Sequence, residues 1–389
     1  MLRPVARWLL RKGRRRRVTF LSGEPHTPGH HYRVERHAQA ARRAGFATTI
    51  VNTGQARTRL DAFLAADLAF VWRCWWDEDV AAAVAAAREG GAAVVFDIDD
   101  LLFEPELARH EEIDGLRSQG AAEDEMQVFF AGFARTLAAA DYCTAPTAPL
   151  LDRMRARSDR PGFILPNGFD TATLKRSRAA LRARRAAPSD GLLRIGYAAG
   201  TRTHQRDFAE AADAVARILA EGANRRLVLF KSGELPQVML EEFPALVPHA
   251  HQIEWREMRP LSELPEELAR FDINIAPLQK DNLFCEAKSE LKYFEAALVE
   301  IPTVASPTRP YRAAIKHQRT GFLAADPQGW YAAISLLAAD PHRRARIGRA
   351  AYRDCRRRFG PAACRRGFSA MAAEILRARS SATSARGRT

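Results

Sequence analysis

Cysteine is scarce in this chain, and its few cysteines are not spaced as pairs. The 389 residues contain five of them, at Cys74, Cys143, Cys285, Cys355 and Cys364. Their odd number and the absence of any Cys-x-x-Cys pair argue against a disulfide framework and against a zinc site. We therefore expect reduced thiols and a cytoplasmic location, because disulfides are rare in that compartment.

Long apolar runs are also lacking. No stretch approaches the roughly 20 consecutive apolar residues that a transmembrane helix needs. The first residues interleave arginines with apolar side chains, so they lack the continuous apolar core of a signal peptide. The sequence therefore predicts neither a membrane-spanning protein nor a secreted one.

Acidic residues are missing from one end of the chain and few at the other. Residues 1–17 contain eight Lys and Arg and no acid, and residues 340–389 contain fourteen Arg and three acids. The two ends together carry a net charge of +19. Because the whole chain carries +14, residues 18–339 carry −5. Because that body has no aromatic-interleaved basic groove, we do not expect a nucleic-acid partner. In the first segment Arg3, Arg7 and Arg11 share one helical face, a pattern that suits an anionic membrane surface. A solvated tail explains the segment equally well.

Between the ends, short strand-like runs alternate with helical ones. Strands are expected at 17–22, 48–51, 68–72, 93–97, 142–145 and 163–165, and again at 193–198, 226–230, 252–255, 273–277 and 303–306. This alternation predicts parallel sheets covered by helices on both faces. The fold class is therefore α/β, with two Rossmann-like, doubly wound parallel-sheet domains that face a cleft. Ligands bind such sheets at the carboxyl ends of the strands, so the cleft is the expected site.

The domain boundaries follow from shifts in composition. A stretch of Arg, Ala, Pro and Ser without an apolar period indicates a linker. The prediction is a basic amphipathic segment at 1–17, a first Rossmann-like domain at 18–174, the linker at 175–190, a second Rossmann-like domain at 191–360, and a C-terminal helix with a basic tail at 361–389. For the helix at 361–389, packing back on the first domain is one of the expected arrangements.

The most informative segment runs from Phe284 to Ser306. It predicts a loop, a helix from about Ser289, a tight turn and a buried strand. In that helix Lys288, Lys292 and Glu295 lie on one side at spacings of four and three. A helix N-terminus with a lysine beside it can hold a diphosphate, while Glu295 is placed for a ribose diol. An amphipathic surface helix with solvated charges would have the same spacing.

A second polar loop follows the first strand of the second domain and opens a helix. In it Gly200 permits close approach of a ligand, while Thr201 and His204 supply groups that suit phosphate oxygens. The loop is neither a GxGxxG nor a P-loop, and an ordinary capped turn is the alternative. Lys231, after the next strand, is a candidate second cation for the same place.

Seven motifs occur in order, namely Ala140-Asp141, Leu165 to Asp170, Ile195 to Phe208, Asp272 to Leu278, Lys288 to Ala297, Ile301 to Val304 and Thr320 to Leu323. This series resembles the GT-B glycosyltransferases of the family 4 type (glycosyl transferases group 1) over about residues 18–360. The resemblance implies a nucleotide-diphosphate sugar bound mainly by the second domain (191–360), and transfer with retention to an acceptor lying against the first domain (18–174). We expect no obligatory metal. The donor-binding residues would be Gly200, Thr201, His204, Lys231, Lys288, Ser289 and Glu295.

The chain departs from this family at two places. The family grips its donor with a Glu-x7-Glu motif, whose second glutamate corresponds to Glu295. The first would fall on Ala287, with Glu286 and Asn282 as the nearest polar residues. This first departure concerns the contact to the sugar itself. The family's phosphate-binding Arg/Lys pair is not plainly present either: Arg206 stands near the place of its lysine, and Lys288 and Thr201 are the substitutes.

Acidic residues also mark the first domain, at the end of the strand 93–97. Taken alone, Asp97 and Asp99 resemble the Asp-x-Asp of haloacid-dehalogenase phosphatases, which use Mg²⁺, but Leu101 and the late position of the strand disfavour that role. A metal-binding Asp-x-Asp of the other glycosyltransferase class, or simple loop capping, are further alternatives. We expect Asp99 and Asp100 to bind acceptor hydroxyls or to assist proton transfer.

In the loop after the first strand, Gly29 permits close approach of a ligand, and His31 or Arg33 is placed to face a diphosphate. Glycosyltransferases of this type place such a loop over the donor diphosphate, so His31 joins Asp99 and Asp100 as a catalytic candidate. The expected function is sugar transfer to a glycan or lipid-linked acceptor in bacterial surface polysaccharide biosynthesis, in the cytoplasm or at the inner membrane face. The alternatives are a phosphatase using Asp97 and Asp99, and a non-catalytic glycosyltransferase-like binding protein.

Overall fold

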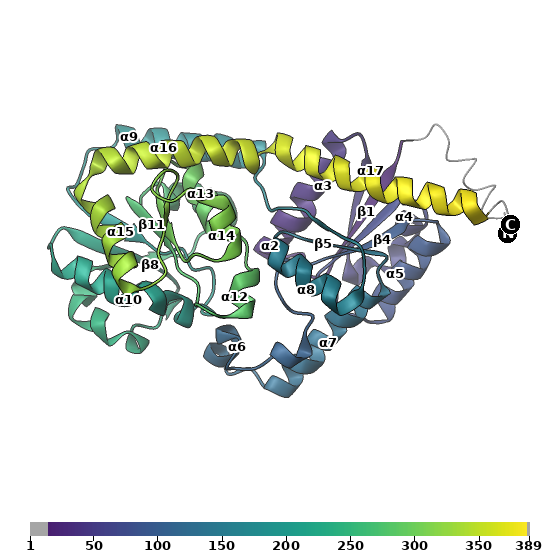
Figure 1. Ribbon diagram of the computed structural model, residues 1–389, viewed down its shortest axis with the longest axis horizontal. Helices are drawn as coiled ribbons and strands as arrows, with labels where there is room; N and C mark the ends of the chain where they lie inside the picture. The colour runs from purple at the N-terminus through teal and green to yellow at the C-terminus, as the bar shows by residue number, and fades with distance from the viewer. Residues whose placement is uncertain (1–14, 387–389) are drawn as a thin grey trace. The chain divides into compact units, whose positions relative to one another are not determined.

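The computed structural model describes residues 15–386, which form two compact α/β units (Figure 1). The first unit comprises the described chain up to Pro105, Val128–Gly168 and the chain from Pro361 onwards. The second comprises Glu106–Gln127 and Phe169–Gly360. Each unit contains one largely parallel sheet, so the prediction of two parallel-sheet α/β domains is confirmed. The basic segment predicted at 1–17 lies mostly outside the described residues.

The first unit is built on a six-stranded parallel sheet in the order β2-β1-β3-β4-β5-β6. Its central strands are apolar at nearly every position and fully buried, as expected for parallel strands covered on both faces. The strands are β1 (Arg17–Ser22), β2 (Ala47–Asn52), β3 (Leu68–Trp72), β4 (Ala93–Asp97), β5 (Tyr142–Ala145) and β6 (Gly162–Ile164). The helices are α2 (Pro28–His30), α3 (Arg36–Arg43), α4 (Leu60–Leu64), α5 (Glu78–Glu89), α7 (Glu123–Ala139, shared with the second unit), α8 (Ala148–Ser158) and α17 (Pro361–Arg386).

The second unit has the sheet order β10-β8-β7-β11-β12-β13, with β9 antiparallel beside β8. Its strands are β7 (Leu193–Gly196), β8 (Arg225–Ser232), β9 (Leu235–Pro236), β10 (Ile253–Glu257), β11 (Ile273–Ala276), β12 (Thr303–Ala305) and β13 (Phe322–Leu323). Its helices are α6 (Asp114–Gln119), α9 (Thr171–Ala186), α10 (Gln205–Ala220), α11 (Leu264–Leu268), α12 (Leu283–Ala287), α13 (Leu291–Leu298), α14 (Arg309–Ala314), α15 (Pro327–Ala339) and α16 (Pro341–Arg358).

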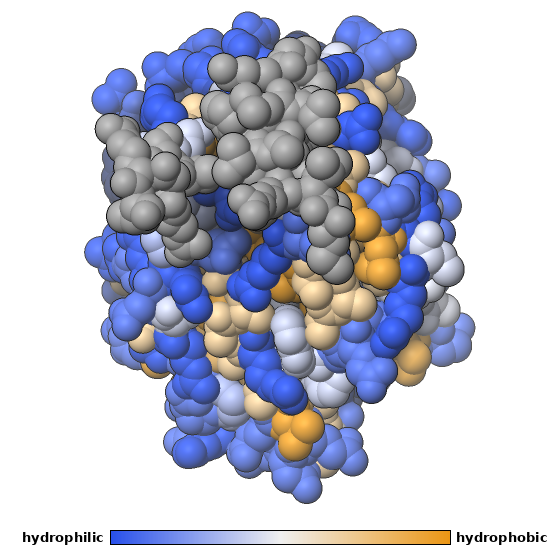
Figure 2. Space-filling model, turned by 90° about the vertical axis from the view of Figure 1, so that its right-hand side faces the viewer, coloured by the Kyte–Doolittle hydropathy of each residue, from blue (hydrophilic) through white to orange (hydrophobic). Residues whose placement is uncertain are grey.

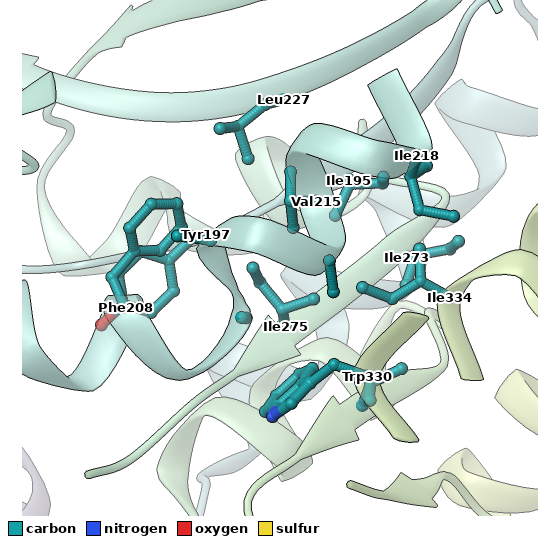
Figure 3. Close-up of a cluster of buried hydrophobic side chains, with 14 of the residues drawn as sticks. Ile195, Tyr197, Phe208, Val215, Ile218, Leu227, Ile273, Ile275, Trp330 and Ile334 are labelled. Carbon is teal, nitrogen blue, oxygen red and sulfur yellow. The ribbon is translucent and has the colours of Figure 1, made fainter. Parts of the chain in front are cut away.

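The core of the second unit joins the sheet to α10 and α15 (Figure 3). Side chains of β7 and β11 meet the apolar faces of the two helices, among them Ile195, Ile273, Val215, Trp330 and Ile334. At the end of β7, Tyr197 stacks on Phe208 of α10 with ring centroids 5.2 Å apart. This packing fixes the first turn of α10 against the carboxyl end of β7, where the candidate site lies.

Helix α17 belongs to the first unit although it ends the chain. Phe368 is fully buried and lies between Phe46 and Phe70, with centroid distances of 5.7 and 5.8 Å. The helix therefore completes the apolar core on one face of that sheet. Figure 2 shows one face of the molecule, on which hydrophilic side chains surround a smaller apolar area. Within the described chain, no helix combines the length and the apolar character that crossing a bilayer requires.

The stretch expected to be a linker at 175–190 is mostly helical. Helix α9 begins after Asp170, whose carboxylate accepts a hydrogen bond of 2.7 Å from the Thr173 N–H. Ala180 is buried against a cluster that includes Phe271. The many arginines concealed the narrow apolar stripe of this helix, which is why composition alone indicated a linker.

Candidate functional site

The sheet order of the second unit identifies a place for ligands. Strands β8 and β10 follow β7 on one side, whereas β11, β12 and β13 lie on its other side. The chain therefore reverses its direction of winding between β7 and β11. In open α/β sheets ligands bind at the carboxyl ends of the strands at such a switch point. The loops after β7 and after β11 contain the predicted residues Gly200, Thr201, His204 and Lys288.

Asp207 joins these loops from the first turn of α10. Its carboxylate is 3% exposed and accepts four hydrogen bonds. His204 Nδ1 lies at 2.8 Å and Lys288 Nζ at 2.9 Å. The Gln279 N–H donates at 2.9 Å and the Cys285 thiol at 3.0 Å. A buried carboxylate thus holds His204 and Lys288 next to each other, at 3.3 Å between Nδ1 and Nζ.

The electrostatics of this cluster set its protonation. Burial opposes ionisation of Asp207, but the Lys288 ammonium and the His204 hydrogen bond outweigh it, so the pKa of Asp207 lies well below its ordinary value. Burial and, after it, the Lys288 ammonium lower the pKa of His204 to about 4. Burial and then Lys288 also lower the pKa of Lys292. At neutral pH the cluster therefore combines the Asp207 carboxylate and a neutral His204 imidazole with the Lys288 ammonium.

The segment from Leu283 to Leu298 contains two helices. The short α12 ends at Ala287, residues 288–290 form a link that contains Lys288 and Ser289, and α13, on which Glu295 lies, begins at Leu291. Ala287, at the position of the family's first glutamate, is 2% exposed.

The two polar neighbours of Ala287 are engaged elsewhere. Asn282 caps α12 by accepting from the Cys285 N–H and donates to the Glu112 carbonyl at 2.7 Å. Glu286 accepts from the Arg309 N–H at 2.7 Å. Neither side chain therefore replaces the missing carboxylate in this arrangement.

The remaining predicted donor residues lie at two different places. At Gly200 an added Cβ would meet nothing within 4 Å, so the backbone there is open. The hydroxyl groups of Thr201 and Thr203 are 2.6 Å apart in the same loop. Lys231 forms an ion pair with Glu257 of β10 at 3.5 Å, on the side of β8 away from β7 and β11.

Sequence reasoning missed one part of this site, the segment 106–127. Although it connects strands of the first unit, it packs in the second. Arg206 Nη1 donates to the carbonyls of His110 and Glu111 at 3.1 and 2.7 Å, and its backbone N–H donates to Asp114 at 2.9 Å. Arg206 therefore anchors this segment. The one residue in the sequence that could have indicated this packing is Gly115, because an added Cβ there would come within 2.9 Å of Thr203.

In the first unit, the predicted residues Asp99 and Asp100 are gathered around Arg73. This arginine, at the end of β3, has φ of 47°, a left-handed conformation that few side chains adopt. It forms ion pairs with Asp100, with Asp99 at 3.3 Å and with Glu24 at 3.0 Å. Burial raises the pKa of Asp99, and Arg73 opposes this rise. Backbone strain of this kind clusters at functional sites.

The other acidic residue of this loop has a structural partner. Asp97 is 1% exposed and accepts from Arg33 at 2.6 and 3.0 Å, and from the Thr144 hydroxyl at 2.6 Å. The expectation that Arg33 could face a diphosphate is therefore wrong, because Arg33 is buried in this pair. His31 lies in a π-helical turn (His31–Glu35), and its Nδ1 is 2.6 Å from Glu35.

No group of three or more His, Cys, Asp or Glu side chains that could hold a metal ion is present among residues 15–386.

Comparisons with known proteins concern first the sequence of the second unit. A sequence model of the family glycosyl transferases group 1 matches residues 193–340. No curated protein matches the sequence.

Solved structures match nearly the whole chain. HepE from Anabaena, in complex with UDP and glucose, is 12% identical with a TM-score of 0.63, over 92% of this chain and 100% of HepE. Sucrose-phosphate synthase from Thermosynechococcus elongatus is 15% identical with a TM-score of 0.64, over 94% and 100%. A glycosyltransferase from Rickettsia africae is 9% identical with a TM-score of 0.61, over 93% and 99%.

The structural similarities establish the fold of both units, and the family match lies in the unit that contains His204, Asp207 and Lys288. The chain therefore has the GT-B fold, and its residues 193–340 match the family model of glycosyl transferases group 1.

Proposed function

We propose that this glycosyltransferase moves a sugar from a nucleotide-diphosphate sugar to a hydroxyl of a glycan or lipid-linked acceptor, with retention at the anomeric carbon. The supporting observation is the cluster at the switch point of the second unit, where Asp207 holds Lys288 beside His204. HepE was crystallised with UDP and with UDP-glucose, which makes a UDP-sugar the first donor to test.

In this proposal the second unit stabilises the leaving diphosphate. The Lys288 ammonium and the backbone N–H groups at the start of α13 supply positive charge where negative charge develops. Gly200, Thr201 and Ser289 add backbone and hydroxyl donors, and Lys231 adds a more distant cation. Glu295, further along α13, binds the ribose hydroxyls. This set neutralises a diphosphate with side chains and backbone, without an obligatory metal.

The transfer step exchanges one bond for another at the anomeric carbon. The bond from that carbon to the phosphate oxygen breaks, and the bond to the acceptor oxygen forms on the same face. The proton of the acceptor hydroxyl passes to the departing phosphate oxygen. Asp99, Asp100 and His31 of the first unit hold acceptor hydroxyls, and Arg73 keeps the two carboxylates in place.

The acceptor class rests on the charge distribution of the sequence. The basic ends suit an anionic membrane surface, and we propose a peripheral location on the inner face of a bacterial membrane during surface polysaccharide synthesis. Liposome sedimentation tests this part, with and without anionic lipid, for the full chain and for a variant in which Arg3, Arg7 and Arg11 are changed to Gln.

A thermal-shift screen tests the donor site. UDP, GDP, TDP and ADP are compared with and without Mg²⁺, for the wild type, Glu295→Ala and the control Asp213→Ala, which changes an exposed residue of α10. We expect one diphosphate to raise Tm by several degrees, since saturation at 100 times Kd adds about 2.7 kcal/mol. The rise should not depend on Mg²⁺ and should be lost only in Glu295→Ala.

Two other outcomes would overturn the proposal. The absence of a response to every nucleotide would favour a non-catalytic binding protein. Mg²⁺-dependent release of phosphate from a phosphomonoester, unchanged in Glu295→Ala, would favour the phosphatase. The buried ion pair between Asp97 and Arg33 speaks against the phosphatase, because it occupies the carboxylate that would act as nucleophile.

A further inference from the structure

The donor sugar lacks the contact that the motif at Ala287 would normally provide. The methyl group of Ala287 is buried, and Asn282 and Glu286 bond to backbone groups. A group of another kind must then recognise the sugar, if the proposed function is right. Polar groups of suitable chemistry are present in the cluster around Asp207.

The hydrogen bonds of His204 fix its tautomer. Asp207 is an acceptor only when ionised, and its oxygen lies 2.8 Å from His204 Nδ1, so the proton is on Nδ1. Lys288 is also close to Nδ1, but it donates to the same carboxylate at 2.9 Å. The lone pair is therefore on Nε2, which makes no hydrogen bond within residues 15–386. The side chain is 20% exposed, so a ligand can reach it.

His204 lies beside the lysines of the site, in a loop separate from the helix that contains Glu295. Its Nδ1 is 3.3 Å from Lys288 Nζ, and Lys292 interacts electrostatically with His204 as well as with Lys288 and Glu295. If Glu295 binds the ribose and the lysines bind the diphosphate, His204 lies next to the diphosphate and is a candidate contact for the sugar attached to it.

The chemistry of Nε2 selects the partner. Ionised phosphate oxygens carry no proton, so a lone pair on a neutral imidazole would repel them. Burial keeps the imidazole neutral, because it lowers the pKa of His204 to about 4. A sugar hydroxyl, in contrast, can donate to Nε2 at a normal hydrogen-bond distance.

We propose that His204 accepts a hydrogen bond through Nε2 from a ring hydroxyl of the transferred sugar and so replaces the contact missing at Ala287. Asp207 is the positioning residue that fixes the tautomer of His204. The site then selects donors with a free hydroxyl at one ring position. Donors that are deoxygenated or acylated there are rejected, because a buried acceptor would be left without its partner. This proposal rests on the proposed donor site.

Calorimetric titration of matched ligand pairs tests it. The pairs are UDP with UDP-glucose, GDP with GDP-mannose and ADP with ADP-glucose. Each pair is titrated into the wild type, His204→Phe and His204→Gln. The control variant is His251→Phe, which changes an exposed histidine of the same unit. For the pair that binds, His204→Phe should weaken the sugar nucleotide about tenfold or more and the free diphosphate less than about threefold. His204→Gln should recover most of the loss, because its amide oxygen is an acceptor.

Deoxy donors identify the hydroxyl. On the wild type, one of the 2-, 3-, 4- and 6-deoxy sugar nucleotides should bind about tenfold more weakly than its parent. The same change should have no further effect on His204→Phe, since the two losses are one interaction. Circular dichroism and Tm of each variant establish that it is folded.

The other outcomes overturn the inference in distinguishable ways. Equal weakening of the diphosphate and the sugar nucleotide by His204→Phe would place His204 on the phosphates, with the donor site intact. Unchanged binding of both would remove His204 from the site. No binding of any pair by the wild type would overturn the proposed function and this inference together.

Discussion

Arg33 and Asp97 form a buried, two-pronged ion pair in the interior of the first unit, with nitrogen–oxygen distances of 2.6 and 3.0 Å. Arg33 also donates to the Leu165 carbonyl at 2.6 Å and to the Asn167 side chain at 3.0 Å. The pair therefore ties the segment after β1 to the end of β4 and to the chain after β6. Both groups are satisfied inside the protein, which gives them a structural role.

Asp97→Ala should destabilise the first unit strongly, because it leaves the Arg33 guanidinium buried without its counter-charge. We expect a loss of about 3–5 kcal/mol in the free energy of unfolding, measured by urea denaturation. Asp79→Ala breaks an exposed ion pair with Arg57 and should leave unfolding nearly unchanged. Equal behaviour of the two variants would contradict the structural role of Asp97.

Phe368→Ala tests whether α17 is part of the first unit's core. The ring is fully buried between Phe46 and Phe70, so its removal leaves a cavity in that core. We expect a loss of about 3–5 kcal/mol, seen as a lower urea midpoint. Ser380→Ala, on an exposed part of the same helix, is the control. A wild-type midpoint for Phe368→Ala would mean that α17 packs there only loosely.

Much of the fold could be predicted because parallel strands leave a strong local signal. Runs such as 68–72 and 93–97 are apolar throughout, and the structure has β3 and β4 at those residues. Their ends then indicated where ligands bind. Composition predicts a linker at 175–190, whereas most of this stretch belongs to helix α9. The few apolar residues of α9 lie among arginines, and only the contact with Phe271 reveals that they are part of a core.

Parts of the site depend on partners distant in sequence. Asp207 looks like an ordinary acid in the first turn of a helix, where the dipole favours it. Its function as the common partner of His204 and Lys288 requires loops that meet only in the folded sheet. Arg33 likewise resembles a surface cation until Asp97, 64 residues away, is placed beside it. Spacing predicts which face a residue occupies, not what lies opposite.

Glu290→Gln should make the protein less sensitive to alkaline pH. Burial raises the pKa of Glu290 to about 7 from a reference value of 4.5. The folded state thus binds this proton more tightly than the unfolded state, so the wild type loses stability as pH rises from about 4.5 through 7. Glutamine cannot ionise, and we expect it to gain about 1–3 kcal/mol over the wild type at pH 8 and little at pH 5.

Urea midpoints of both proteins at pH 5 and pH 8 measure this difference. Glu300→Gln is the matched control, because its carboxylate is ion-paired with Arg178 and Arg185 and the variant should gain nothing at pH 8. A constant difference between Glu290→Gln and the wild type at both pH values would show that Glu290 does not titrate in this range.

Lys288 and Arg206 offer a direct test of which cation meets the diphosphate. Arg206 stands near the place of the family's lysine, but its guanidinium donates to the carbonyls of His110 and Glu111. The Lys288 ammonium lies beside His204 in the loop that opens α13.

Lys288→Met should therefore weaken binding of the nucleoside diphosphate about 10–100-fold, since a charge-assisted hydrogen bond contributes about 1.5–3 kcal/mol. Arg206→Met should weaken it less than about threefold while lowering Tm, because it releases the segment 106–127. The reverse ranking in a calorimetric titration would mean that Arg206 leaves those carbonyls when the donor binds, and that the segment 106–127 moves with it.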